Sequence, residues 1–125
     1  MKSGVVLGVD GGNTKTVAVV ATPAGDVLGT GLGTCSDIYG APSPQEALEV
    51  LVGVVREALA EAGVSPSEVA ATVGSLAGAD WPEDYELYHL ELSRRAGLSG
   101  RVKGNCSVGS ARGTRDHPPL GARGL

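Results

Sequence analysis

Short apolar runs alternate with polar or glycine-rich turns along the first third of the chain. Three of these runs are long enough to form strands, at residues 4–9, 16–22 and 27–32. The sequence PAGD at 23–26 separates the second run from the third and is a strong turn signal. Because so few residues connect the runs, the pattern predicts an antiparallel meander, in which no helix joins one strand to the next.

A helical pattern follows over residues 44–62. Ser43 is a suitable N-cap, Pro44 suits the first helical position, and Glu46 completes a capping box with Ser43. Gly63 is placed to end the helix. Apolar residues recur at helical spacing and form a single stripe, which consists of Leu48, Leu51, Val52, Val55, Leu59 and Ala62. The pattern therefore predicts a helix with one buried face.

The pattern then continues as a turn, a strand, a helix and a strand. Residues 65–68 read SPSE, a second capping box for one short turn, and residues 69–76 read as a buried strand. A helix is expected over 82–96, ended by Gly97, and a last strand at 101–103. The predicted order is β-β-β-α-β-α-β, an α/β fold with a mixed sheet and helices packed on its faces.

Composition and charge narrow the class of protein. The 125 residues suffice for one domain, and 42 % hydrophobic residues with a mean hydropathy of +0.07 are typical of a globular protein. Residues 1–100 hold five Lys or Arg and thirteen Asp or Glu, whereas residues 101–125 hold five and one. The basic end has no aromatic residues and no helical stripe, so we do not expect nucleic-acid binding. No run of about 18 apolar residues occurs and the two cysteines lack metal-type spacing, so we expect a cytoplasmic protein without a membrane partner.

A glycine-rich polar stretch, GVDGGNTKT at residues 8–16, interrupts the apolar pattern between the first two strands. Gly11 and Gly12 would let the backbone take positive φ values and approach a ligand closely. Successive N–H groups in such a turn form a concavity that binds anions. The side chains of Asn13, Thr14 and Thr16 add donors, and Lys15 adds a positive charge.

Together these groups suit a phosphate chain, and Asp10 could hold a water bound to Mg²⁺, because hard cations prefer oxygen ligands. The stretch is not a Walker A loop, because the spacing differs and a strand follows in place of a helix. The alternative is a glycine-rich hairpin whose polar side chains are only solvated.

Three segments carry a resemblance to a known family. GVDGGNTKT followed by an apolar strand resembles the first phosphate motif of the actin-like ATPase and sugar kinase superfamily. It is most similar to the BadF/BadG/BcrA/BcrD-type ATPases, which include N-acetylglucosamine kinases. GTCSDIYGAPSP (33–44) and GSLAGADWPEDY (74–85) resemble two further segments of that branch. The resemblance implies a ribonuclease-H-like half-domain over residues 1–105, the N-terminal lobe of such a protein.

The resemblance also implies roles for individual residues. Asp10 would organise Mg²⁺, and the β- and γ-phosphates of ATP would be lined by Gly11, Gly12, Asn13, Thr14 and Lys15. Ser36 and Asp37 would bond sugar hydroxyls, although their segment could equally be an ordinary polar connection. The sugar would also lie near Ser75, Gly78 and Asp80. Asp80 has an alternative role as the cap of the following helix.

Other polar and aromatic residues are assigned structural roles. Trp81 and Tyr85 are expected to pack their helix and not to stack on a sugar. His89 and His117 have no nearby partner in the sequence that would make either a base or a ligand, so we expect both to be solvated.

The end of the chain departs from the family pattern. Relatives carry an Asn-Asp pair after the second helix, and its aspartate accepts the proton of the sugar hydroxyl. Here the pair reads Asn105-Cys106, and a thiol, with an ordinary pKa of about 8.5, is a poor substitute for a carboxylate base. The stretch SARGT (110–114) is one residue short of the family pattern. We therefore expect residues 106–125 to be an irregular basic tail of a truncated or frame-shifted sequence, with no intact catalytic base.

The leading hypothesis is the N-terminal lobe of an ATP-dependent sugar kinase for an N-acetylhexosamine, inactive as this chain alone. Its partners would be Mg·ATP, an amino sugar and a C-terminal lobe, and the full-length family could form homodimers. One alternative is an activator ATPase of the 2-hydroxyacyl-CoA dehydratase kind, although Cys35 and Cys106 do not match the expected iron–sulfur setting. A second alternative is a non-catalytic module that binds a sugar or a partner protein.

Overall fold

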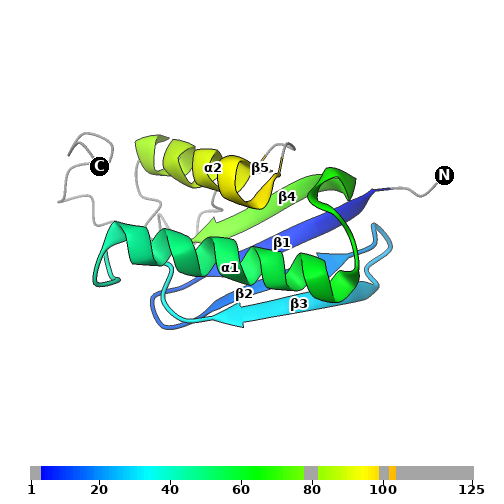
Figure 1. Cartoon of the computed structure of the whole chain (residues 1–125), viewed down its shortest axis with the longest axis horizontal. Helices are drawn as coiled ribbons and strands as arrows, with labels where there is room; N and C mark the ends of the chain where they lie inside the picture. The colour runs from blue at the N-terminus through cyan, green and yellow to red at the C-terminus, as the bar shows by residue number, and fades with distance from the viewer. Residues whose placement is uncertain (1–3, 78–81, 99–101, 104–125) are drawn as a thin grey trace.

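The computed structural model describes residues 4–77, 82–98 and 102–103. It shows a five-stranded sheet and two long helices (Figure 1). The elements are β1 (Val5–Gly11), β2 (Thr16–Ala21), β3 (Val27–Gly33), α1 (Pro44–Ala62), the short 3₁₀ helix η1 (Pro66–Glu68), β4 (Val69–Leu76), α2 (Pro82–Ala96) and β5 (Val102–Lys103). The predicted order of elements is confirmed, and the main difference is that β1 reaches Gly11 where the sequence predicted an end at residue 9.

The sheet is mixed, with the strand order β3-β2-β1-β4-β5. The first three strands form the predicted antiparallel meander, and β4 and β5 are added parallel to β1. In this register Asp10 of β1 lies opposite Ser75 of β4. The carboxyl ends of two parallel strands therefore meet at one edge of the sheet, where ligands of α/β proteins commonly bind.

Both helices lie on the same face of the sheet, in front of it in Figure 1. Alternate residues of the strands point to this face and form one aliphatic core with the two helices, including Leu7, Val20, Leu51, Val55 and Leu92. Residues on the other face are half-buried or exposed, and Val73 is one of the exposed ones. None of the helices within the described part of the chain is both long and apolar enough to cross a membrane.

Both ends of α1 are capped, and the caps set the boundaries between the helix and its neighbouring segments. The Ser43 hydroxyl accepts the Glu46 N–H at 3.1 Å, as the capping box predicts. Gly63 ends the helix with a φ of 71°, in the left-handed region that favours glycine. The start of α1 is thereby held directly after the polar segment that follows β3.

Three glycines of β3 bring α1 unusually close to the sheet. A Cβ atom at Gly29 would lie 2.5 Å from the Ala58 carbonyl oxygen, and one at Gly31 would overlap the Val54 carbonyl oxygen. At Gly33 a Cβ would lie 2.5 Å from a methyl group of Val54. Because two of these neighbours are helix backbone, α1 could not keep its position over any other residue at 29 or 31.

This close approach brings two glutamates of α1 over the free edge of β3. Glu61 Oε1 accepts the backbone N–H of Thr30 at 2.6 Å, and Glu57 Oε1 accepts the backbone N–H of Leu32 at 3.2 Å. The edge is otherwise well suited to strand pairing, because Leu32 is 67 % exposed. The two carboxylates therefore occupy donors that a neighbouring strand would need.

Removing both carboxylates should make the protein self-associate through β3. We expect the Glu57→Ala/Glu61→Ala variant to dimerise at least about tenfold more tightly than the unmodified chain, because its edge N–H groups are free. Light scattering during gel filtration over a range of concentrations measures this. The matched control, Glu49→Ala/Glu86→Ala, removes two exposed acids away from β3. Equal masses for the two variants at every concentration would contradict the prediction.

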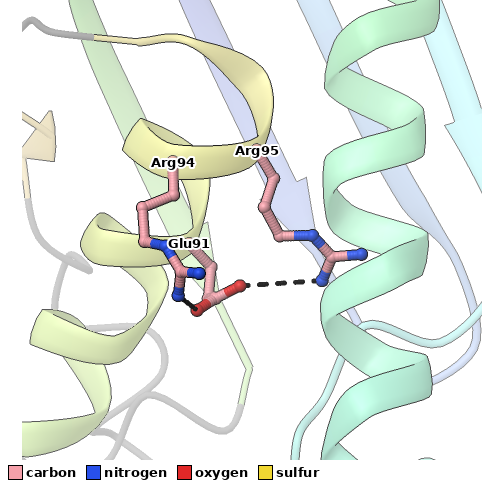
Figure 2. Close-up of polar contacts among 3 residues, drawn as sticks. All are labelled: Glu91, Arg94 and Arg95. Carbon is pink, nitrogen blue, oxygen red and sulfur yellow. Dashed lines mark hydrogen bonds and ion pairs between the residues drawn. The ribbon is translucent and has the colours of Figure 1, made fainter.

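The end of α2 carries a small cluster of charges (Figure 2). Glu91 accepts a hydrogen bond from Arg94 at 3.2 Å, and Arg95 lies 3.6 Å from the same carboxylate, with its side chain directed toward α1. Two arginines in the last turn are favourable because the C-terminus of a helix carries a partial negative charge. The Arg94 side chain is 65 % exposed, so its ion pair with Glu91 contributes little stability.

Candidate functional site

Three segments meet where β1 and β4 end. They are the glycine turn (residues 11–16), the segment between β3 and α1 (residues 34–41, here called the substrate segment) and the end of β4. The N–H of Ser36 donates to the Gly12 carbonyl at 3.1 Å, and the N–H of Ala77 donates to the Gly11 carbonyl at 2.7 Å. The glycine turn is thus bonded directly to both neighbours.

The two glycines of the turn are required for close contact and not for an unusual backbone conformation. The positive φ values expected at Gly11 and Gly12 are absent; among the described residues only Gly25, Gly63 and Gly97 have them. A Cβ at Gly12 would lie 2.7 Å from the Lys15 carbonyl oxygen, and a Cβ at Gly11 would lie 2.7 Å from Ser36 Oγ. That expectation was therefore wrong, because the lack of a side chain serves packing at both positions.

The turn leaves a specific set of donors for an anion. The N–H of Gly12 closes the turn by donating to the Lys15 carbonyl at 2.8 Å, so it is not available to a ligand. None of the hydrogen bonds among the described residues uses the N–H of Asn13 or Thr14. The side chains of Asn13, Thr14 and Lys15 are exposed. Anion binding would therefore rely on residues 13–15, with the glycines as their support.

Asp10 is exposed at the end of β1 and borders a hollow of about 340 Å³ on the open face of the sheet. The hollow is otherwise lined mostly by valines and glycines, with Ser75 as its other polar member. No group of three acidic, histidine or cysteine side chains that could hold a metal occurs within residues 4–77, 82–98 and 102–103. A single carboxylate still fits Mg²⁺, which keeps several waters and takes its other ligands from phosphate.

Ser36 is turned into the protein. It is 1 % exposed, and its hydroxyl lies 2.8 Å from that of Thr16, which also donates to the Thr34 carbonyl at 2.6 Å. These bonds tie the start of β2 to the substrate segment. Ser36 therefore supports the site from within, and its carbonyl and N–H groups, more than its side chain, connect it to the neighbouring segments.

Asp37 lies beside the glycine turn. Its carboxylate accepts the Tyr39 N–H at 2.8 Å and is 3.5 Å from the side-chain amide of Asn13, while its carbonyl accepts the N–H of Gly40. Asp37 is 6 % exposed. The Cys35 thiol is 4.0 Å from Asn13 Oδ1 on the same side. The structure thus brings one predicted sugar-binding residue next to one predicted phosphate-binding residue.

Two buried polar residues of α2 complete the site, and the sequence analysis missed both. The hydroxyl of Tyr88 lies 2.9 Å from the Ser36 carbonyl, to which it donates, and 3.3 Å from the Ala77 carbonyl. Burial raises the pKa of Tyr88 well above its ordinary value, so this hydroxyl stays protonated. Asp84 is fully buried and accepts the hydroxyl of Tyr39 at 2.9 Å. Their i, i+4 spacing on the buried face of α2 is the signal that could have identified them.

Several predicted residues lie outside the described part of the chain. They are Gly78, Asp80, Trp81, Asn105, Cys106 and His117, together with the side chain of Tyr85. His89 is exposed on α2. The predicted roles of these residues, and of the tail at 106–125, stay predictions.

The chain is similar to one known protein family and, in its fold, to several solved structures. The model of the BadF/BadG/BcrA/BcrD ATPase family matches residues 7–93. A structure described as an N-acetylglucosamine kinase from Chromobacterium violaceum is 17 % identical with a TM-score of 0.56, over 84 % of this chain and 35 % of that one. A reductive activator for a corrinoid, iron–sulfur protein is 16 % identical with a TM-score of 0.54, over 81 % and 22 %.

YeaZ from Pseudomonas aeruginosa is 16 % identical with a TM-score of 0.51, over 90 % of this chain and 49 % of its own. At such identities the likeness shows the fold alone, and it confirms the predicted α/β fold of the actin-like ATPase and sugar kinase type. The chain spans about a third of the length of the kinase structure. A search of curated protein sequences finds no match.

Proposed function

Because the chain belongs to the BadF/BadG/BcrA/BcrD ATPase family, we propose that it is the N-terminal lobe of an ATP-dependent sugar kinase for an amino sugar. The observation that carries the proposal is the direct bonding of the glycine turn to the substrate segment. Ser36 N–H donates to Gly12 O, and the Asn13 amide lies 3.5 Å from the Asp37 carboxylate. Phosphoryl transfer needs a phosphate site and an acceptor site at such close range.

The phosphate half of the site is the exposed part of the glycine turn. The N–H groups of Asn13 and Thr14 and the ammonium group of Lys15 are donors suited to the β- and γ-phosphates of ATP. Asp10, one residue before the turn, would hold Mg²⁺ through its carboxylate or a bound water. When bound, the metal would neutralise negative charge on the phosphates.

The acceptor half is the substrate segment. A sugar presents hydroxyl groups in fixed directions, and a carboxylate oriented by backbone N–H groups can accept from them. Asp37 is oriented in this way by the N–H of Tyr39. Ser36, with its buried hydroxyl, would act by holding the segment in place. Ser75, Gly78 and Asp80 belong to the proposed site through the family resemblance.

We expect this chain to differ in its ability to bind the substrates and to transfer phosphate. The resemblance places a carboxylate base where this sequence has Cys106, beside Asn105. A thiol is less suited than a carboxylate to accept the proton of a sugar hydroxyl, because its geometry and its electrostatic properties differ. We therefore expect the 125-residue chain to bind Mg·ATP and the sugar and to transfer little phosphate.

Lys15→Ala should weaken Mg·ATP binding by about tenfold, the loss of one charge-assisted hydrogen bond to phosphate. Calorimetric titration of the full chain measures this, with Arg56→Ala as the control that removes an exposed cation on α1. Equal affinities for the two variants would refute a phosphate role for the turn.

Titration with N-acetylglucosamine distinguishes the candidate functions. The kinase lobe is supported if the chain binds both the sugar and Mg·ATP, and if Asp37→Ala abolishes binding of the sugar. Binding of Mg·ATP without any amino sugar favours an activator-type ATPase, and binding of the sugar without nucleotide favours a non-catalytic module.

A further inference from the structure

The three segments of the site are joined in a closed triangle of hydrogen bonds. One side is Ser36 N–H to Gly12 O, and the second is Ala77 N–H to Gly11 O. Both of these sides start from the glycine turn. The third side, between the substrate segment and the end of β4, is a three-centre hydrogen bond: the single proton of the Tyr88 hydroxyl lies mainly toward the Ser36 carbonyl, at 2.9 Å, and is shared with the Ala77 carbonyl, at 3.3 Å.

We propose that Tyr88 is a positioning residue whose hydroxyl locks the substrate segment to the end of β4, so that the glycine turn and the substrate segment respond to ligands as one unit. The proposal rests on the proposed function for what binds there. Its structural part, the lock itself, can be tested without any ligand.

The surroundings of Tyr88 support such a role. The residue is 1 % exposed, and its hydroxyl also accepts the N–H of Ile38 at 3.4 Å, so it contacts three backbone groups. The ring belongs to the core and is carried by α2, a regular helix that fixes its position. Without the hydroxyl, the Ile38 N–H would lose its partner in a buried place, which favours opening of the segment.

A second contact from the same helix holds the next part of the segment. Asp84, one turn before Tyr88, accepts the hydroxyl of Tyr39 through both carboxylate oxygens, at 2.9 and 3.1 Å. The substrate segment is therefore held by α2 at two points, on either side of Ile38. Asp37 lies between these points and beside Asn13.

The predicted consequence is coupling between the two halves of the site. A phosphate bound at Asn13 and Thr14 would restrain the turn, and the bond from Ser36 N–H to Gly12 O would pass that restraint to the substrate segment. Tyr88 prevents the segment from relaxing away from β4. Nucleotide binding should then favour the arrangement of Asp37 that receives the sugar. By reciprocity, sugar binding should strengthen nucleotide binding by the same factor.

The first test is hydrogen exchange of the full 125-residue chain, followed by NMR, in the Tyr88→Phe variant. The variant keeps the ring and removes only the hydroxyl. We expect the amides of Ser36, Ile38 and Ala77 to exchange at least about tenfold faster than in the unmodified chain, while the Gly12 amide is unchanged relative to the control. The control is Val20→Ala, a fully buried position of β2 at the opposite end of the sheet, which reports general loss of stability.

The second test is titration with Mg·ATP, with chemical shifts as the readout. In the unmodified chain the signals of Asn13, Thr14, Ile38 and Ala77 should all move. In Tyr88→Phe the change at Ile38 should be lost, while those of the turn and of Ala77, whose N–H donates directly to Gly11, should remain. In Val20→Ala the pattern should match the unmodified chain.

The two tests fail in different ways. If Mg·ATP moves no signal of the unmodified chain, the proposed function is wrong, and the exchange experiment still decides the role of Tyr88. If Tyr88→Phe and Val20→Ala show the same exchange at Ser36, Ile38 and Ala77, the positioning role is overturned even when Mg·ATP binds.

Discussion

Replacing Gly31 with alanine should destabilise the protein by about 3 kcal/mol, the upper part of the range for overpacked sites, and replacing it with valine should prevent folding. The reason is that a Cβ atom at this position overlaps the Val54 carbonyl oxygen. The obstacle is the backbone of α1 and not the end of a flexible side chain, so the whole helix must move. Natural domains are stable by only about 5–15 kcal/mol, which leaves little margin for such a shift.

Urea denaturation followed by circular dichroism measures this effect. Gly53→Ala is a matched control, because Gly53 lies within α1 with no atom in the way of a Cβ. It should raise the stability by about 0.5–1 kcal/mol, since alanine favours a helix more than glycine does. If the two substitutions had the same sign, α1 would not lie against β3 as the structure shows.

Replacing Gly12 with valine should reduce Mg·ATP affinity by at least about 100-fold, because the turn cannot close with its donors aligned. A Cβ at Gly12 lies 2.7 Å from the Lys15 carbonyl oxygen, which is also the acceptor of the Gly12 N–H. The turn must open to relieve this contact, and the N–H groups of Asn13 and Thr14 would then diverge.

Gly12 lies between the end of β1 and the start of β2, so the strands should persist in Gly12→Val. Circular dichroism should show an unchanged secondary structure, while calorimetric titration shows the loss of binding. Gly53→Ala, far from the turn, should bind Mg·ATP as the unmodified chain does. Full affinity in a folded Gly12→Val would show that phosphate does not bind at this turn.

The sequence predicted the elements well because their signals are local. Hydrophobic period, the capping residues Ser43 and Gly63 and the turn around Gly25 each act within a few residues, and the structure has them as predicted. The meander followed from connection lengths alone. Of the stretch at 8–16, residues 8–11 continue β1 and Thr16 begins β2, so only residues 12–15 interrupt the strands; hydrogen bonds join this turn to the substrate segment and to the end of β4.

What the sequence did not predict depends on contacts between distant residues. Tyr88 and Ser36 are 52 positions apart, Tyr39 and Asp84 are 45 apart, and Glu61 reaches Thr30 across 31 positions. No local sequence pattern indicates such pairs. The same limit explains the error at Gly11 and Gly12, whose lack of a Cβ is explained by close neighbours in the folded structure and not by the φ values that glycine permits.

The close approach at Gly31 and the bonding of the glycine turn have a common origin. In both places the absence of a side chain lets one backbone contact another, and polar groups are positioned as a result. Over β3 these are the carboxylates of Glu57 and Glu61, which cover an edge. At the turn they are donors that lie next to Asp37.

The central claim is that residues 13–15 bind the phosphates of a nucleotide. The most direct measurement is the titration of ¹⁵N-labelled full chain with Mg·ATP, observed at every backbone amide. The claim predicts that the largest shift changes occur at Asn13, Thr14 and Lys15 and saturate with the nucleotide concentration. Unchanged amides in this turn, together with saturating changes elsewhere in the described chain, would contradict it.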